Sequence, residues 1–124
     1  MSKTVVIVDD KGVMRQALGR LFKSAGGFEV CGEASSGREA IEVARSLRPD
    51  LIVLDLLMPG MTGLETAQQL KKFALPSKII LYSLNAEDIG EKEAFAAGVS
   101  AVVSKAEGVK TLITKARAVL RQAS

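Results

Sequence analysis

One aspartate, Asp55, stands inside the otherwise apolar run IVLDLLMPG at residues 52–60. A carboxylate in an apolar interior is costly unless it is paired, metal-bound or protonated. Its residue type suits two kinds of chemistry, namely ligation of a hard metal ion and nucleophilic capture of a phosphoryl group. Asp55 is therefore the first candidate for a functional residue.

Polar side chains also follow other apolar runs of the chain. Asp9 and Asp10 follow VVIV, whereas Ser83 follows IILY and Lys105 follows AVVS. Taken alone, an Asp or Ser in such a place is often a cap or turn residue, and a Lys is often a solvated charge. Taken together after separate strands, these residues are expected at the carboxyl edge of one sheet, where open α/β folds bind ligands. We interpret them as one site.

The three carboxylates predict a cation. Brought together, Asp9, Asp10 and Asp55 repel one another, which raises at least one pKa unless a positive ion neutralises them. Mg²⁺ prefers oxygen ligands and usually takes one or two carboxylates together with phosphate oxygens. Asp10, Asp55 and a nearby backbone carbonyl fit this role, with Asp9 either ligating the ion or holding a metal-bound water.

The two remaining side chains suit phosphate. The Lys105 ammonium provides a point charge for phosphoryl oxygens, and the Ser83 hydroxyl can donate a hydrogen bond to them. With a metal beside them, these groups favour phosphoryl transfer onto Asp55, a reaction in which catalysis is mostly positioning and charge neutralisation.

Short apolar runs are predicted to form the strands that position these groups. They are rich in Val, Ile and Leu, which is typical of strands buried on both faces of a sheet. The runs span residues 5–8, 28–34, 51–54, 79–82 and 101–103.

Helical patterns follow each of these runs. Ser36 with Glu39, and Thr62 with Glu65, form capping-box patterns at the start of the second and third helices. A fourth helix is expected over residues 88–97, with the thinnest apolar stripe. The stripes predicted to face the core are Val13, Met14, Ala17, Leu18, Leu21 and Phe22; Ala40, Ile41, Ala44 and Leu47; Leu64, Ala67, Leu70 and Phe73; Ile89, Ala94 and Phe95; and Val109, Leu112, Ile113, Ala116 and Leu120.

The alternation of strands and helices with short connections predicts right-handed βαβ units. The fold class is therefore α/β, doubly wound, with a parallel sheet between two helical layers. A length of 124 residues fits one domain.

Composition excludes several function classes. With one cysteine, Cys31, and no histidine, the chain can form neither an internal disulfide nor a zinc site or a Ser-His catalytic pair. The net charge of +3 is better read as solvated lysines than as nucleic-acid binding, because no basic patch is interleaved with aromatics. No secretory or membrane-spanning segment is apparent, so a cytoplasmic location is the expectation.

The sequence resembles the receiver domain of two-component response regulators. The matching segments are VVIVDDKGVMR, PDLIVLDLLMPGMTGLE, IILYS and AGVSAVVSK, and the resemblance covers essentially the whole chain. It implies one receiver domain over residues 1–124, with a flavodoxin-like (βα)5 fold and a five-stranded parallel sheet of order 2-1-3-4-5. It also implies a signalling switch that is not a turnover enzyme, since receivers catalyse only their own phosphorylation and dephosphorylation.

The resemblance assigns the ligands of the metal. It implies that Asp9, Asp10 and Asp55 hold Mg²⁺ together with the backbone carbonyl of Leu57.

The resemblance also assigns the phosphoryl chemistry. It implies that Asp55 accepts phosphate from a sensor histidine kinase or a phosphotransfer protein. Ser83 is the implied switch hydroxyl, and Lys105 is the implied contact to the phosphoryl group. The signal would then alter the surface of the fourth helix, fifth strand and fifth helix, which is also the face through which the family is expected to form homodimers.

The chain departs from the common receiver pattern at several positions. Val102 stands where receivers usually have Tyr or Phe, Ala106 where a proline often follows the lysine, and Leu84 where a small residue often follows the switch hydroxyl. Leu57 and Asn85 occupy positions that border the attacking water in receivers. Leu84 and the missing proline resemble receivers that precede a LuxR-type helix-turn-helix domain. The chain is therefore expected to be a stand-alone receiver or a receiver excised from a longer regulator, without DNA binding of its own.

Two alternatives compete with the switch. A degenerate receiver could act as a phosphorylation-independent interaction module, a hypothesis that rests on Val102 and Leu84. A small aspartyl-phosphate phosphohydrolase is less favoured, because those enzymes need a second acid two residues after the nucleophile and Leu57 stands there.

Overall fold

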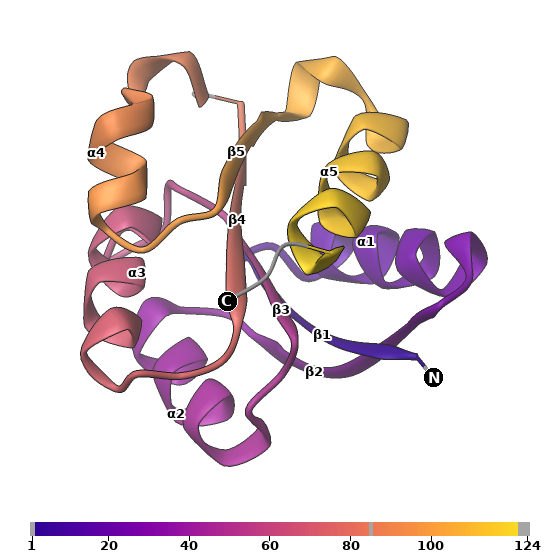
Figure 1. Ribbon diagram of the computed structural model, residues 1–124, viewed down its shortest axis with the longest axis horizontal. Coiled ribbons are helices and arrows are strands. Elements are labelled where there is room, and N and C mark those ends of the chain that lie inside the picture. The colour runs from indigo at the N-terminus through magenta and orange to yellow at the C-terminus, as the bar shows by residue number, and fades with distance from the viewer. Residues whose placement is uncertain (1, 85, 122–124) are drawn as a thin grey trace.

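The structure is a computed structural model that describes residues 2–84 and 86–121 of the chain. Within these residues, five strands form one parallel sheet of order β2-β1-β3-β4-β5 (Figure 1). The predicted class, layers and strand order are therefore confirmed. The strands are β1 (Lys3–Val8), β2 (Phe28–Ala34), β3 (Leu51–Leu54), β4 (Lys78–Ser83) and β5 (Ala101–Ser104).

The helices lie in two layers, one on each face of the sheet. Helices α1 and α5 cover one face, and α2, α3 and α4 cover the other (Figure 1). Short 3-10 turns, η1 and η2, precede α4 and α5. The bounds are α1 (Gly12–Ala25), α2 (Gly37–Leu47), α3 (Gly63–Lys72), η1 (Ala86–Asp88), α4 (Glu91–Ala96), η2 (Lys105–Glu107) and α5 (Val109–Arg121).

The core is divided by the sheet into two apolar layers. Alternation along β1 sends Val5 and Ile7 toward Phe22 of α1, and Val6 and Val8 toward the opposite layer. All four β1 residues are at most 1% exposed. Strands buried on both faces explain why their sequence is continuously apolar rather than alternating.

Both predicted helix caps form, although only one is a complete capping box. The Thr62 hydroxyl accepts from the Glu65 amide at 3.1 Å, and the Glu65 carboxylate accepts from the Thr62 amide at 2.9 Å. At α2, the Ser36 hydroxyl accepts from the Glu39 amide, but the Glu39 carboxylate accepts from the amide of Ser35, one residue earlier than the pattern predicts.

The fourth helix is shorter than predicted. Residues 86–88 form the 3-10 turn η1, and the α-helix begins only after Gly90, which is extended at φ −70° and ψ 145°. Ala94 is buried, whereas Phe95, predicted to face the core, is 78% exposed. A six-residue helix presents less than two turns to the sheet, so it covers the sheet with few side chains.

Five further residues of the predicted stripes are exposed. Ala17 is exposed on α1, and Leu47 and Phe73, which lie at the carboxyl ends of α2 and α3, are 48% and 39% exposed. Val13 and Val109 are 80% and 50% exposed, although both fit the apolar period of their helices. Val13 and Val109 each lie in the first turn of a helix that starts at the carboxyl edge of the sheet. The helix begins beyond the strands there, so the first turn has little of the sheet beneath it.

In the part of the chain that the structure describes, no helix combines the length and the apolar character required to span a bilayer.

Candidate functional site

The three predicted acids lie together at the carboxyl edge of the sheet. Asp9 and Asp10 follow β1, and Asp55 follows the neighbouring strand β3, which pairs with β1 so that Val8 lies opposite Leu54. One carboxylate oxygen from each acid lies within 4.8 Å of the others. Asp9 and Asp55 are buried, and Asp10 is partly exposed. Because the adjacent parallel strands β1 and β3 end at the same level, Asp9 and Asp55 lie together although they are 46 positions apart in the sequence.

The backbone of this cluster continues the sheet. The Asp55 amide donates to the Val8 carbonyl at 3.0 Å, and the Asp9 amide donates to the Ala34 carbonyl at 3.1 Å. These hydrogen bonds hold the acids to the strand ends rather than to a free loop. The relative positions of the acids therefore follow from the register of β2, β1 and β3.

Arg15 of α1 holds the β1–α1 connection from the helix side. Its Nη1 donates to the Asp9 carbonyl at 2.6 Å, and its Nε donates to Glu33 Oε1 at 3.0 Å, so the guanidinium joins the acidic loop to the edge strand β2. We did not single out Arg15 from the sequence. Its only sequence signal is a basic residue in the second turn of a helix that follows the acid pair.

Lys105 bridges two of the acids. Its Nζ lies 3.4 Å from Asp9 Oδ2 and 3.7 Å from Asp55 Oδ1, and its side chain is 12% exposed. The ring of Tyr82 supports the ammonium from a further side, with 5.8 Å between Nζ and the ring centroid, a distance at which a cation–π attraction acts. The structure therefore brings Lys105 into the acidic cluster, as its place after β5 predicted.

Ser83 lies at the same edge of the sheet. It is the last residue of β4 and 2% exposed. Leu81 of β4 pairs with Leu54 of β3. Ser83 follows Leu81 by two residues and Asp55 follows Leu54 by one, so both lie at the same end of these paired strands. The next residue, Leu84, is 67% exposed. Asn85 lies outside the described residues.

The loop after Asp55 returns closely to the site at Gly63. The Gly63 amide donates to the Leu56 carbonyl at 2.7 Å. A Cβ at Gly63 would lie 2.2 Å from the Asp55 carbonyl oxygen and 2.9 Å from the Leu56 Cα. Glycine is thus required for α3 to begin this close to the site. Leu57, which lies in the loop between Asp55 and Gly63, is 55% exposed, so its side chain lies largely outside the core.

Burial and charge act on Asp55 in opposite directions. Burial raises the pKa of Asp55 above its ordinary value of 3.8, and the nearby Asp9 carboxylate also raises it. The ammonium groups of Lys105 and Lys11, together with a hydrogen bond from the Leu57 backbone, lower the pKa in part. Desolvation is the largest of these effects, so the net change is a pKa above the ordinary value.

The donor atoms fit a hard divalent cation. All three acids supply carboxylate oxygens, which are the ligands that Mg²⁺ prefers. Asp10 Oδ1 is shielded from solvent and has no hydrogen-bond partner among the described residues, and the Lys11 ammonium lies 3.6 Å from it. A buried carboxylate oxygen without a hydrogen bond is an atom that a metal ion would satisfy.

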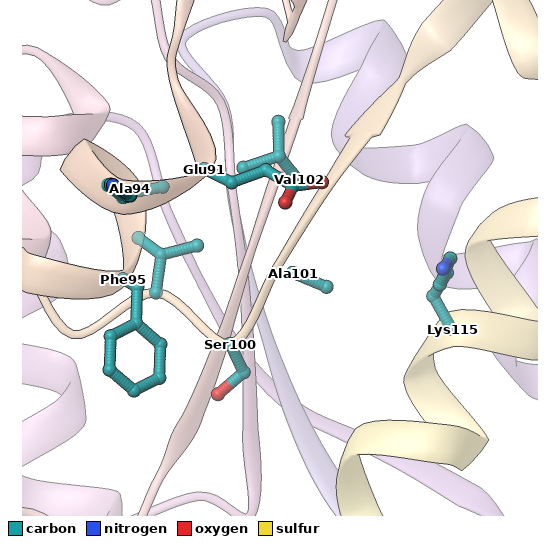
Figure 2. Close-up of a pocket in the computed structure, with 9 residues that line it drawn as sticks. Glu91, Ala94, Phe95, Ser100, Ala101, Val102 and Lys115 are labelled. Carbon is teal, nitrogen blue, oxygen red and sulfur yellow. The ribbon is translucent and has the colours of Figure 1, made fainter.

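A separate groove lies on the face formed by α4, β5 and α5, away from the acidic cluster. It encloses about 470 Å³. Figure 2 shows Phe95 and Ala94 on α4, Ala101 and Val102 on β5, and Lys115 on α5 around this groove. The groove holds none of the acids, so it is not the site of the chemistry.

Comparisons with known proteins agree with this geometry. The sequence matches the family described as "Response regulator receiver domain" over residues 5–117. The nitrate/nitrite response regulator protein NarL of Escherichia coli (strain K12) is 44% identical over 82 residues, which are 66% of this chain and 38% of that protein. The matched segment therefore spans less than half of the length of NarL.

Two further proteins extend the comparison. The chemotaxis protein CheY of Thermotoga maritima is 38% identical over 105 residues, which are 85% of this chain and 87% of that protein. The crystal structure of a DNA-binding response regulator of the LuxR family from Staphylococcus aureus superposes with a TM-score of 0.86 at 28% identity, over 96% of this chain and 99% of that one.

Proposed function

The chain belongs to the response regulator receiver domain family, on the LuxR branch, and on that premise we propose that it is the phospho-accepting switch of a two-component system, with Asp55 as acceptor. The observation that carries the proposal is the meeting of Asp9, Asp10, Asp55 and Lys105 at one edge of the sheet. We treat residues 1–124 as one receiver domain, supported by the family match and the single sheet.

In the proposed reaction, an Asp55 carboxylate oxygen attacks the phosphorus atom of a phosphohistidine on a sensor kinase or phosphotransfer protein. The new O–P bond forms as the N–P bond breaks, and the leaving imidazole takes up a proton. Lys105, 3.7 Å from Asp55 Oδ1, is placed to pair with the incoming phosphoryl oxygens. Ser83 is buried at the same edge, and its hydroxyl is proposed to donate a hydrogen bond to another phosphoryl oxygen.

Asp9, Asp10 and Asp55 are the proposed side-chain ligands of Mg²⁺, with the Leu57 carbonyl as a further ligand. Asp10 Oδ1, which has no hydrogen-bond partner among the described residues, and the all-oxygen donor set support this assignment. When bound, the ion supplies positive charge for the carboxylates and for the phosphoryl oxygens. Without such charge, the burial that raises the pKa of Asp55 also disfavours its nucleophilic form.

The proposed output surface is the α4–β5–α5 face. The chain connects it directly to the site, because Ser83 leads through Leu84 into η1 and then α4. The exposed Phe95 and the groove in Figure 2 make this face the proposed homodimer contact of the switch. We further propose that this domain does not bind DNA and that it catalyses only its own phosphorylation and dephosphorylation. Its proposed location is the cytoplasm.

The alternative of a phosphorylation-independent interaction module draws no support from the acidic site. Such a module has no need of a buried acid that is held beside a lysine and two further acids. The phosphohydrolase alternative lacks its second acid, since the residue two positions after Asp55 is Leu57.

Intact-mass spectrometry after incubation with acetyl phosphate and Mg²⁺ tests the proposal. We expect wild type to gain one phosphoryl group and Asp55→Asn to gain none, because only the carboxylate is nucleophilic. Glu42→Gln, which alters an exposed acid on α2, is the control and should gain the group as wild type does. A folded wild type that gains no mass, or an adduct that persists in Asp55→Asn, would contradict the proposal.

A further inference from the structure

Lys11 has a residue type that its position in the fold does not explain. It is the N-cap residue of α1, and its side chain makes no capping hydrogen bond. Helices favour Ser, Thr, Asp or Asn at this position, and a positive charge at the helix N-terminus opposes the helix dipole. The capping contact here uses the Lys11 amide, which donates to Asp9 Oδ1 at 2.9 Å. Any residue other than proline could supply that amide.

The ammonium of Lys11 turns instead toward the acidic cluster. Its Nζ lies 3.6 Å from Asp10 Oδ1, the buried oxygen that has no hydrogen bond among the described residues. The second lysine of the site, Lys105, forms its ion pairs with Asp9 and Asp55. Lys105 is thus paired with Asp9 and Asp55, whereas Lys11 is paired with Asp10, and the Lys11 ammonium also acts on Asp55 at longer range.

The Lys11 side chain can also move away from Asp10 into solvent. It is 69% exposed, whereas the Lys105 side chain is 12% exposed. A divalent ion on Asp10 would compete with the Lys11 ammonium for the same oxygen, and the two positive charges would repel each other at close range. An exposed lysine can move into water at a modest cost, because an exposed ion pair contributes less free energy than a buried one.

We propose that Lys11 is a tethered counter-ion that competes with Mg²⁺ for Asp10 and so sets the metal affinity of the site, an inference that rests on the function proposed above. When the metal concentration is low, the Lys11 ammonium reduces the repulsion among the three carboxylates. Lys11 also weakens metal binding. Phosphorylation therefore requires a higher Mg²⁺ concentration than it would if the three acids stood without Lys11.

The test is the Mg²⁺ dissociation constant, measured from amide NMR shifts of residues near Asp10 in a metal titration. We expect Lys11→Gln to bind Mg²⁺ about threefold to tenfold more tightly than wild type, because competition and repulsion are both removed. Lys11→Arg keeps the charge and should bind as weakly as wild type. Lys23→Gln removes the same charge from an exposed lysine near the far end of α1 and should leave the affinity unchanged.

A second readout is the melting temperature, which in EDTA reports on Lys11 without any bound metal. In EDTA, Lys11→Gln should unfold at a lower temperature than wild type, because Asp10 loses its counter-ion. Saturating Mg²⁺ should remove or reverse that difference, since the variant binds the ion more tightly. High salt should narrow the gap in affinity between the two proteins, because it screens an exposed ammonium.

Equal or weaker Mg²⁺ binding by Lys11→Gln would overturn the inference. If wild type is phosphorylated on Asp55 in that case, only the role of Lys11 fails. If wild type and Lys11→Gln both fail to bind Mg²⁺ and to accept a phosphoryl group, the proposed function fails, and the inference fails with it.

Discussion

At Asp55, burial and the neighbouring charges have opposing effects on the ionised carboxylate. Its burial raises its pKa more strongly than Lys105 lowers it, so the folded protein disfavours the ionised form relative to the unfolded chain. An acid placed in this way reduces the stability of the fold at neutral pH. The cost is consistent with a residue retained for chemistry rather than for folding.

This balance predicts a pH-dependent difference between wild type and Asp55→Asn in EDTA. Above the ordinary pKa of 3.8, the folded state binds more protons at Asp55 than the unfolded state does, so the contribution of Asp55 to stability falls as pH rises through the raised pKa. The variant cannot ionise, and it should therefore be more stable than wild type near neutral pH and lose this advantage below about pH 4.

Urea unfolding at several pH values measures this difference. Glu42→Gln, at an exposed position of α2, serves as the control and should show no such pH-dependent gain. A wild type that is at least as stable as Asp55→Asn in EDTA at neutral pH would contradict the account based on burial.

At the scale of the elements, the start of α3 is the tightest fit around the site. Gly63 approaches the Asp55 carbonyl so closely that no side chain can be accommodated without moving the loop or the helix. The capping box of Thr62 and Glu65 then fixes where the helix begins. The position of Asp55 thus depends on the helix after it as well as on the strand before it.

Gly63→Ala should lower the free energy of unfolding by about 1–3 kcal/mol, because the added methyl group overpacks a backbone contact. It should also slow phosphorylation by acetyl phosphate, since the Asp55 backbone must shift. The matched control is Gly19→Ala in the interior of α1, where a Cβ meets nothing within 4 Å. That change should raise stability by about 0.5–1 kcal/mol through helix propensity. Urea unfolding and phosphorylation rates of both variants check this, and a neutral Gly63→Ala would refute the close-packing argument.

At the scale of the whole molecule, α4 is the element best placed to respond to the site. It is six residues long, buries Ala94 and leaves Phe95 exposed, and it follows Ser83 along the chain through η1. Short helices with few buried contacts belong to the low-stability end of a fold, where local rearrangement costs least. A change at Ser83 therefore has a physical route to the α4–β5–α5 face.

Beryllofluoride with Mg²⁺, a mimic of the phosphoryl group, should shift amide NMR signals of α4, β5 and α5 as well as those near Asp55. The reason is that the mimic recruits Ser83 and Lys105, which terminate β4 and follow β5. Mg²⁺ alone should act mainly near the acids, and Asp55→Asn should show no response to the mimic. Shifts confined to the acidic site would instead favour the phosphorylation-independent interaction module.

Much of this organisation could be predicted from the sequence. Runs of β-branched and aliphatic residues bounded by turn residues identify strands, and residues 28–34 and 51–54 match β2 and β3 to the residue. Polar residues that follow parallel strands lie at one edge of the sheet, so the placement of Asp9, Asp10, Asp55 and Lys105 at the same edge followed from the predicted topology. Apolar character and flanking turn residues are local properties, and a sequence records these directly. The exact strand ends are less well predicted, since β1, β4 and β5 extend one or two residues beyond the predicted runs.

Only the tertiary structure decided where the long side chains point and which apolar residues are covered. Phe95 and Val13 fit an apolar period yet are exposed, because coverage depends on how far each helix extends over the sheet. Arg15 and Lys11 reach the acidic loop through flexible side chains, whose direction depends on neighbours brought from β1 and β2. The sequence by itself thus determined the fold and the candidate residues that gather at one edge of the sheet. The tertiary structure decided the balance of charge around them, because that balance depends on distances between residues far apart in the chain.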